Sequence, residues 1–275
     1  MDKIRRNERM SAMMKILADS PNKIFTLSTF CELFGAAKST MSEDVDALQA
    51  VVNIFGLGEL ETVTGAAGGV RYRTKVPARS AMAYIKELCG ELSGSKRVLP
   101  GNYLYYSDIL SDPQTVRRMG EILATAYYDA GPDFVLTMET KGIPVALETA
   151  RALGVPLVIA RRSSKVYEGS AVNINYVSGS SGSIQTMSLS RRAVKEGQKA
   201  LIVDDFLKGG GTAKGMVELM REFNVEVVGS AFVVETAAPN KKRIAGQRSL
   251  MMLDFEAGED ADVAKVTPAD WLAEL

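Results

Sequence analysis

The sequence predicts an α/β protein, built on a parallel sheet flanked by helices and preceded by a small helix-turn-helix domain. From about residue 113 onward, short apolar segments alternate with segments of helical periodicity, which is typical of a parallel sheet with right-handed crossovers. Ahead of them, three short amphipathic segments are followed by two β-rich segments around a glycine-rich turn. We place the boundary at residue 76, so the expected domains span residues 1–76 and 77–275.

Three helices and a wing are expected in the N-terminal domain. Apolar residues recur with helical spacing in residues 5–19. Thr26 can cap a second helix, and the turn at residues 35–37 separates it from a third helix over residues 38–52. The glycine-rich tip of the wing lies at residues 64–69, between two short strands.

This pattern favours DNA binding, with a helical bundle used only for dimerisation as the alternative. The third helix carries Glu43, Asp44 and Asp46, which phosphates would repel, but its first turn is free of acids. Basic residues gather at the first helix and on the wing. The candidate DNA contacts are Arg5, Arg6, Arg9, Lys38, Ser39, Thr40, Ser42, Arg71 and Arg73.

Composition narrows the chemistry. The chain has 275 residues, with 33 Lys and Arg against 33 Asp and Glu, so any nucleic-acid surface must be local. It has no histidine, which excludes Ser-His-Asp and Cys-His catalysis and His-ligated zinc. No apolar run is long enough to span a bilayer, and the N-terminus lacks an apolar signal segment. We therefore expect a cytoplasmic protein without a membrane partner.

The second domain begins with a predicted helix over residues 81–92. The aromatic stretch 103–106 is either a packed hydrophobic corner or a stacking surface for a base. The polar segment 161–192 is expected to be a long loop, in which Arg161, Arg162 and Lys165 can reach a diphosphate. The remaining predicted helices are 113–128, 143–153 and 212–223, and the predicted strands are 134–138, 156–160, 200–204, 225–234 and 250–255.

The stretch from residue 200 to 213 organises this domain. Its apolar strand ends in Asp204 and Asp205, at the edge where open α/β sheets bind ligands. Gly209, Gly210 and Gly211 let backbone amides close on an anion, and Thr212 is expected to cap the next helix. Carboxylates accept hydrogen bonds from sugar hydroxyls, so the stretch predicts a sugar-phosphate site. The alternative is a strand, a turn and a capped helix without a ligand.

Thr140, Lys141 and Gly142 form a second candidate anion loop. They follow a predicted strand and open a helix, and Lys141 adds a cation. Alone, these residues fit a solvated turn equally well. Placed in the same sheet as Asp204, they predict a pocket for two phosphate groups.

These residues carry a family resemblance. The stretch around Asp204 resembles the phosphoribosyl diphosphate motif of type I phosphoribosyltransferases. The chain as a whole resembles purine operon repressors that join a winged helix to a type I phosphoribosyltransferase-like domain. Besides the winged-helix pattern, the segments that carry this resemblance are 64–70, 140–144, 168–170, 175–181, 185–189 and 204–206.

The resemblance implies a dimeric repressor of purine biosynthesis and transport genes. Its partners would be double-stranded operator DNA and a second copy of the chain, and its effector phosphoribosyl diphosphate, which weakens operator binding. Mg²⁺ would accompany the diphosphate without dedicated metal ligands, and guanine alarmone nucleotides would compete for the pocket. The implied effector contacts are Thr140, Lys141, Gly142, Arg162, Asp204, Asp205, Phe206, Lys208, Gly209, Gly210, Gly211, Thr212 and Tyr103.

One departure from the enzyme pattern favours a sensor without catalytic residues. Catalytic members carry Ala or Asp at the position of Lys208 and Thr at that of Gly209. A lysine is protonated at neutral pH and cannot act as a general base there. An active purine phosphoribosyltransferase and a dimerisation scaffold with vestigial pockets remain as alternatives.

Overall fold

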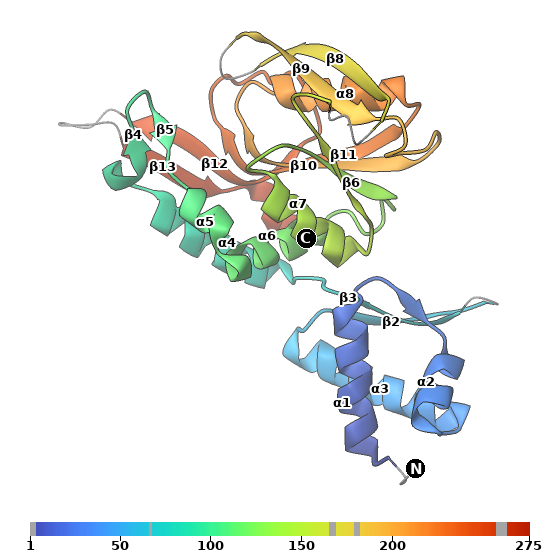
Figure 1. Ribbon diagram of the computed structural model, residues 1–275. Coiled ribbons are helices and arrows are strands. Elements are labelled where there is room, and N and C mark those ends of the chain that lie inside the picture. The colour runs from blue at the N-terminus through green and yellow to red at the C-terminus, as the bar shows by residue number, and fades with distance from the viewer. Residues whose placement is uncertain (1–3, 66–67, 165–168, 179–181, 257–262) are drawn as a thin grey trace. The chain divides into compact units, whose positions relative to one another are not determined.

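The computed structural model describes residues 4–65, 68–164, 169–178, 182–256 and 263–275 (Figure 1). The chain divides into two compact units. The first comprises Met1–Pro77 with Arg151–Gly154, and the second Ala78–Ala150 with Val155–Leu275. No helix in the described part of the chain is both long and apolar enough to cross a membrane.

The N-terminal unit is a winged helix, as predicted. The Thr26 hydroxyl accepts a hydrogen bond from the amide of Thr29 and caps the second helix. Gly35 then turns the chain at a φ of 61°, a backbone region that favours glycine. The elements of this unit are α1 (Arg6–Asp19), β1 (Ile24–Phe25), α2 (Leu27–Phe34), α3 (Lys38–Phe55), β2 (Glu59–Val63) and β3 (Gly69–Arg73).

The apolar faces of these helices meet over a small antiparallel sheet. The sheet has the order β1-β3-β2, and β2 and β3 form the wing. Met13, Leu17, Phe30, Met41 and Leu60 are buried together in the core. The helical periodicity that predicted these helices therefore marks their inner faces. The predicted wing tip at Ala66 and Ala67 lies outside the described residues.

The second unit is an α/β fold. Its elements from Ala78 onward are α4 (Ala78–Leu92), η1 (Ser95–Arg97), β4 (Val98–Leu99), β5 (Tyr103–Leu104), α5 (Ser107–Ser111), α6 (Pro113–Thr125), β6 (Phe134–Met138), α7 (Ile143–Leu153), β7 (Leu157–Ala160), β8 (Ala171–Val177), β9 (Ile184–Ser190), β10 (Lys199–Leu207), α8 (Gly211–Glu222), β11 (Glu226–Thr236), β12 (Arg248–Glu256), β13 (Val263–Pro268) and η3 (Asp270–Glu274).

The main sheet has the order β13-β12-β11-β10-β6-β7, and every pairing except β12 with β13 is parallel. The central strands β6 and β10 consist largely of buried apolar residues, because helices cover both faces. Figure 1 shows α4 and α6 on one face and α8 on the other. The parallel sheet was predicted, whereas the antiparallel edge strand β13 was missed.

The prediction of a long loop over residues 161–192 is wrong, because β8 and β9 form an antiparallel hairpin there. Val172 and Tyr176 face inward while Asn173 and Asn175 are exposed, which is the alternation of a half-buried strand. Tyr176 packs against Gly215 on α8, where a Cβ would lie 3.0 Å from its ring. Lys165 and residues 179–181 lie outside the described part of the chain.

Candidate phosphate-binding site and nucleic-acid interface

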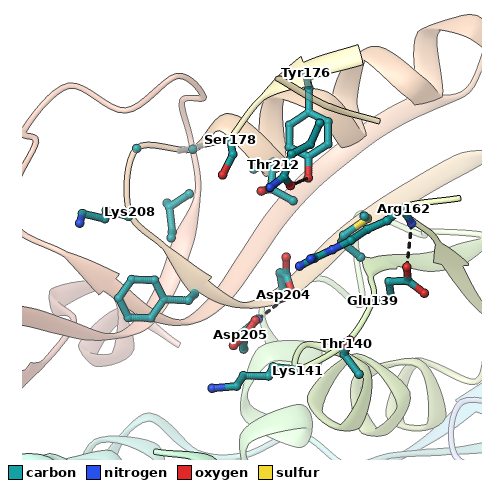
Figure 2. A pocket seen from close by; sticks show the side chains of 17 residues that line it. Glu139, Thr140, Lys141, Arg162, Tyr176, Ser178, Asp204, Asp205, Lys208 and Thr212 are labelled. Carbon is teal, nitrogen blue, oxygen red and sulfur yellow. Dashed lines mark hydrogen bonds between the residues drawn. The ribbon is translucent and has the colours of Figure 1, made fainter. Parts of the chain in front are cut away.

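A cavity of about 610 Å³ opens beside the carboxyl ends of β6 and β10 (Figure 2). Ten of the predicted effector contacts line it: Thr140, Lys141, Arg162, Asp204, Asp205, Phe206, Lys208, Gly209, Gly210 and Thr212. The hairpin that sequence analysis missed contributes Tyr176, Ser178 and Gln185. The two predicted anion loops therefore border one pocket in the C-terminal unit.

The two acids stand at the base of this cavity. Strand β10 runs beyond both acids to Leu207, so the sheet itself fixes their backbone. The amide of Asp205 donates a hydrogen bond to Asp204 Oδ1 at 3.0 Å. Asp204 is only 8% exposed. Burial, and then the neighbouring Asp205 carboxylate, raise the pKa of Asp204 well above its usual range.

Gly142 brings its loop against the first acid. A Cβ at this position would collide with Asp204 Oδ1 and with the hydroxyl of Thr137. Thr137 is fully buried, and its hydroxyl has no hydrogen-bond partner within the described residues. Gly142 thus allows the 140–142 loop to approach Asp204, although it does not itself line the cavity.

The glycine loop leads from β10 into α8. Gly210 is the N-cap residue of α8, with a φ of 76°, and no side chain caps this helix end. The prediction that Thr212 is the cap is therefore wrong. Gly209 accepts a hydrogen bond from the amide of Arg243 at 3.1 Å, which holds the loop from its outer side. The first amides of α8 lack helical partners, so they are free to meet an anion.

Three cationic side chains border the cavity. In Figure 2, Arg162 reaches into the pocket toward Asp204, while Lys208 points away from the two acids. The backbone amide of Arg162 donates to Glu139 Oε1 at 2.7 Å, which fixes the start of its segment. Lys141 lies with its Nζ 5.1 Å from the ring centroid of Tyr106. The pocket thus combines acceptors for hydroxyl groups with cations and amides for phosphates.

An aromatic cavity of about 570 Å³ adjoins the first one and shares Lys141, Phe206 and Lys208 with it. Tyr103 lies in this aromatic cavity, with 60% of its surface exposed. It does not line the first cavity, which is called the phosphate cavity below after its predicted ligand. Tyr106 is buried, stacks on Phe206 at a centroid distance of 6.0 Å, and donates to Asp205 Oδ2 at 2.5 Å. Tyr106 was not predicted as a site residue, since a run of aromatic residues does not show which ring turns inward.

The predicted DNA contacts at the start of α3 lie at the surface of the N-terminal unit. Lys38, Ser39 and Ser42 are exposed and Thr40 is half-buried. No side chain caps this helix, so its leading amides are also available to a phosphate. Arg5 and Arg6 are exposed at the start of α1.

Three other predicted DNA contacts are engaged within the unit. Arg9 is buried and binds Asp44 at 2.9 Å, so the structure does not bring it to the basic surface. Arg71 binds Glu61 at 2.8 Å, and this hydrogen bond is the main cause of the lowered pKa of Glu61. Arg73 lies 3.6 Å from Glu61 and is mostly buried. The exposed candidates are therefore the α3 turn, Arg5 and Arg6, and of these Arg6 also contacts Asp44 at 3.0 Å.

The residues that the structure describes contain no cluster of three or more His, Cys, Asp or Glu side chains that could hold a metal ion. Cys31 and Cys89 are free thiols, and burial raises the pKa of Cys89 to about 12.

Comparisons with known proteins identify both units. Residues 5–74 match the family described as bacterial purine repressor, N-terminal, and residues 106–263 match the phosphoribosyl transferase domain. The chain is 42% identical to the probable purine biosynthesis transcriptional regulator PurR of Streptococcus pneumoniae, over 90% of this chain and 91% of that protein. It is 41% identical to the purine biosynthesis transcriptional repressor PurR of Bacillus subtilis, over 91% and 88%.

The named relatives do not all regulate in the same direction. The purine biosynthesis transcriptional activator PurR of Lactococcus lactis is 39% identical, over 91% of this chain and 93% of that protein. Among solved structures, an adenine phosphoribosyltransferase from Thermoanaerobacter pseudethanolicus superposes with a TM-score of 0.52 at 23% identity. The match covers 60% of this chain and 98% of that one, and it shows the fold alone.

A winged helix with an exposed first turn on α3 precedes a phosphoribosyltransferase-like sheet whose acid pair and two anion loops share one cavity. The relatives with 41–42% identity align with about nine-tenths of this chain, so the alignments include both of the matched domains. The chain therefore belongs to the bacterial purine repressor family of transcription regulators.

Proposed function

We propose that the protein represses purine biosynthesis and transport genes by binding operator DNA as a homodimer, and that phosphoribosyl diphosphate releases it. The cavity carries this proposal, because Asp204 and Asp205 line it together with residues of both loops, Thr140 and Lys141 on one and Gly209, Gly210 and Thr212 on the other. The acids would hold the ribose hydroxyls, the glycine loop the 5-phosphate, and the 140–142 loop the diphosphate. Tyr103 and Phe206 would flank the base position in the adjoining cavity.

Release requires linkage between two binding equilibria. The effector must bind more tightly to the state of the protein with the lower affinity for DNA, and DNA must weaken effector binding by the same factor. Mg²⁺ would arrive with the diphosphate, since the diphosphate oxygens are the hard ligands that suit it, and no dedicated metal ligands of the protein are needed. Guanine alarmone nucleotides are proposed as competitors, because their phosphates fit the same loops.

DNA recognition is assigned to the first turn of α3, with Ser39, Thr40 and Ser42 facing the groove and Lys38, Arg5 and Arg6 on phosphates. The sign of regulation needs its own measurement, because relatives of nearly equal similarity are named repressor and activator. A reporter fused to an operator-controlled promoter, with and without the protein, distinguishes the two.

The direct test is an operator titration at fixed salt with increasing phosphoribosyl diphosphate. We expect the operator affinity to fall until the effector saturates, and a two-fold symmetric complex at a ratio of two chains per site. An unchanged affinity at saturating effector would overturn the proposal. Release of diphosphate with any of the common purine bases would instead support the alternative, an active transferase.

A further inference from the structure

The hydroxyl of Tyr106 already occupies one of the two carboxylates in the phosphate cavity. It donates to Asp205 Oδ2 at 2.5 Å, the short end of the range for a hydroxyl bonded to a carboxylate. Burial and the Asp205 charge raise the pKa of Tyr106 well above its usual range. The phenol therefore keeps its proton and is the donor in this hydrogen bond.

The position of Tyr106 is fixed by its surroundings. The residue is 7% exposed, its ring stacks on Phe206 with an interplanar angle of 25°, and the Lys141 ammonium lies over the ring. Its backbone carbonyl accepts a hydrogen bond from the amide of Leu110 as α5 begins. Because the ring is already ordered, the hydrogen bond to Asp205 forms with little further loss of side-chain entropy.

This hydrogen bond crosses the boundary between the two cavities. Asp205 lines the phosphate cavity and Tyr106 lines the aromatic one, while Lys141, Phe206 and Lys208 line both. A hydroxyl group that enters the phosphate cavity thus meets a carboxylate with one acceptor oxygen already in use. Asp204 has only Oδ2 left for a ligand hydroxyl, since it is buried and its Oδ1 accepts the amide of Asp205.

We propose that the Tyr106 hydroxyl is an internal competitor of the effector: it holds Asp205 in the ligand-free protein and yields that oxygen to a ribose hydroxyl. Tyr106 thereby sets the effector affinity without contacting a phosphate. The exchange replaces one hydroxyl donor by another, so no bond other than a hydrogen bond changes. The inference rests on the proposed function, because it takes a ribose to be the group that Asp205 binds.

The competition applies to one class of ligand. A ligand with vicinal hydroxyls competes with Tyr106 for Asp205, whereas inorganic diphosphate needs only the amides and cations of the two anion loops. Removing the Tyr106 hydroxyl should therefore separate the two ligands. This difference provides a control within each protein variant.

The test is Tyr106→Phe in the full chain, with calorimetric titration of phosphoribosyl diphosphate and of inorganic diphosphate in Mg²⁺. Phenylalanine keeps the ring that stacks on Phe206 and lies under Lys141. We expect the affinity for phosphoribosyl diphosphate to rise by about two- to tenfold, the net worth of one hydrogen bond, and the affinity for diphosphate to stay constant. The matched control is Tyr127→Phe, which removes another buried hydroxyl, one that donates to the Ser230 carbonyl at 2.9 Å in a part of the sheet away from the cavity.

The outcomes separate this inference from the proposed function. An unchanged or lower affinity of Tyr106→Phe for phosphoribosyl diphosphate, or an equal gain for diphosphate, would overturn the inference alone. Failure of the wild-type protein to bind phosphoribosyl diphosphate would overturn both. Hydrogen exchange provides a test on the wild-type protein without a variant. Phosphoribosyl diphosphate, and not diphosphate, should lower the protection of the Leu110 amide. Equal protection of this amide with both ligands counts against the inference.

Discussion

Arg9 and Asp44 form a buried ion pair in the N-terminal unit, with a guanidinium nitrogen 2.9 Å from the carboxylate. The pair joins α1 to α3, and Arg6 adds a second contact to the same acid at 3.0 Å. From the sequence, Asp44 was interpreted as one of three acids on α3 that DNA phosphates would repel. Its burial between two arginines neutralises it and leaves Glu43 and Asp46 as the exposed acids of α3.

Arg9→Met should lower the free energy of unfolding of the N-terminal unit by about 2–4 kcal/mol, because Asp44 then keeps only the exposed Arg6 as a partner. Urea denaturation followed by circular dichroism measures this loss. Arg5→Met, at the exposed N-cap position just before the same helix, is the control and should cost less than about 0.5 kcal/mol. Equal effects of the two substitutions would contradict the structural role of Arg9.

Lys38→Ala should weaken operator binding and reduce the slope of log affinity against log salt by about one, because it removes one phosphate contact. Fluorescence anisotropy at several salt concentrations gives the slope. Effector affinity should not change. Lys86→Ala removes an exposed lysine of α4 in the other unit and serves as the control. A salt slope that Lys38→Ala leaves unaltered would remove this residue from the interface.

The elements that the sequence predicted best are those with a clear period. Helical spacing of apolar residues located α1, α2 and α3, because each of these helices buries one face. Continuous apolar runs located β6 and β10, because these strands are buried on both faces. The β8–β9 hairpin was missed because asparagines alternate with its buried residues in a segment rich in Ser and Gly. In that segment, the alternation of buried and exposed residues predicts a strand less clearly than the polar composition predicts a loop.

The site was predicted where chemistry and backbone position coincide in the sequence, as at Asp204 and the glycine loop. It was missed where the contact depends on tertiary packing. Nothing in the local sequence shows that Tyr106 bonds to an acid 99 positions away, or that Arg9 faces Asp44 across two helices. Long-range pairings of this kind follow from the fold and not from any motif.

Gly142→Ala should reduce the affinity for phosphoribosyl diphosphate by at least tenfold, because its Cβ would collide with Asp204 and Thr137 and force the 140–142 loop away from the acid. Calorimetric titration measures the loss. The matched control is Gly90→Ala, in the interior of α4, where a Cβ meets no neighbouring atom. That variant should bind normally and gain up to about 1 kcal/mol in stability. Normal binding by Gly142→Ala would show that the loop does not depend on this close approach.

Asp204→Asn should stabilise the C-terminal unit at neutral pH by about 1–2 kcal/mol and should abolish effector binding. Substitutions at functional sites commonly raise stability at the expense of function in this way. Because the folded pKa of Asp204 is raised, its protonated form contributes stability that is complete below the unfolded pKa of about 4 and is lost as the pH rises through the folded value. Asparagine does not titrate.

The stability difference between Asp204→Asn and the wild type should therefore widen from pH 4 to pH 8. Urea denaturation of both proteins at several pH values measures it, with the exposed Asp254→Asn as the control for a general change of net charge. A difference that stays constant over this range would show that Asp204 is ionised in the folded protein throughout. In that case the acid pair would carry two charges before any ligand arrives, and its affinity for an anionic sugar phosphate would depend on Mg²⁺ far more strongly.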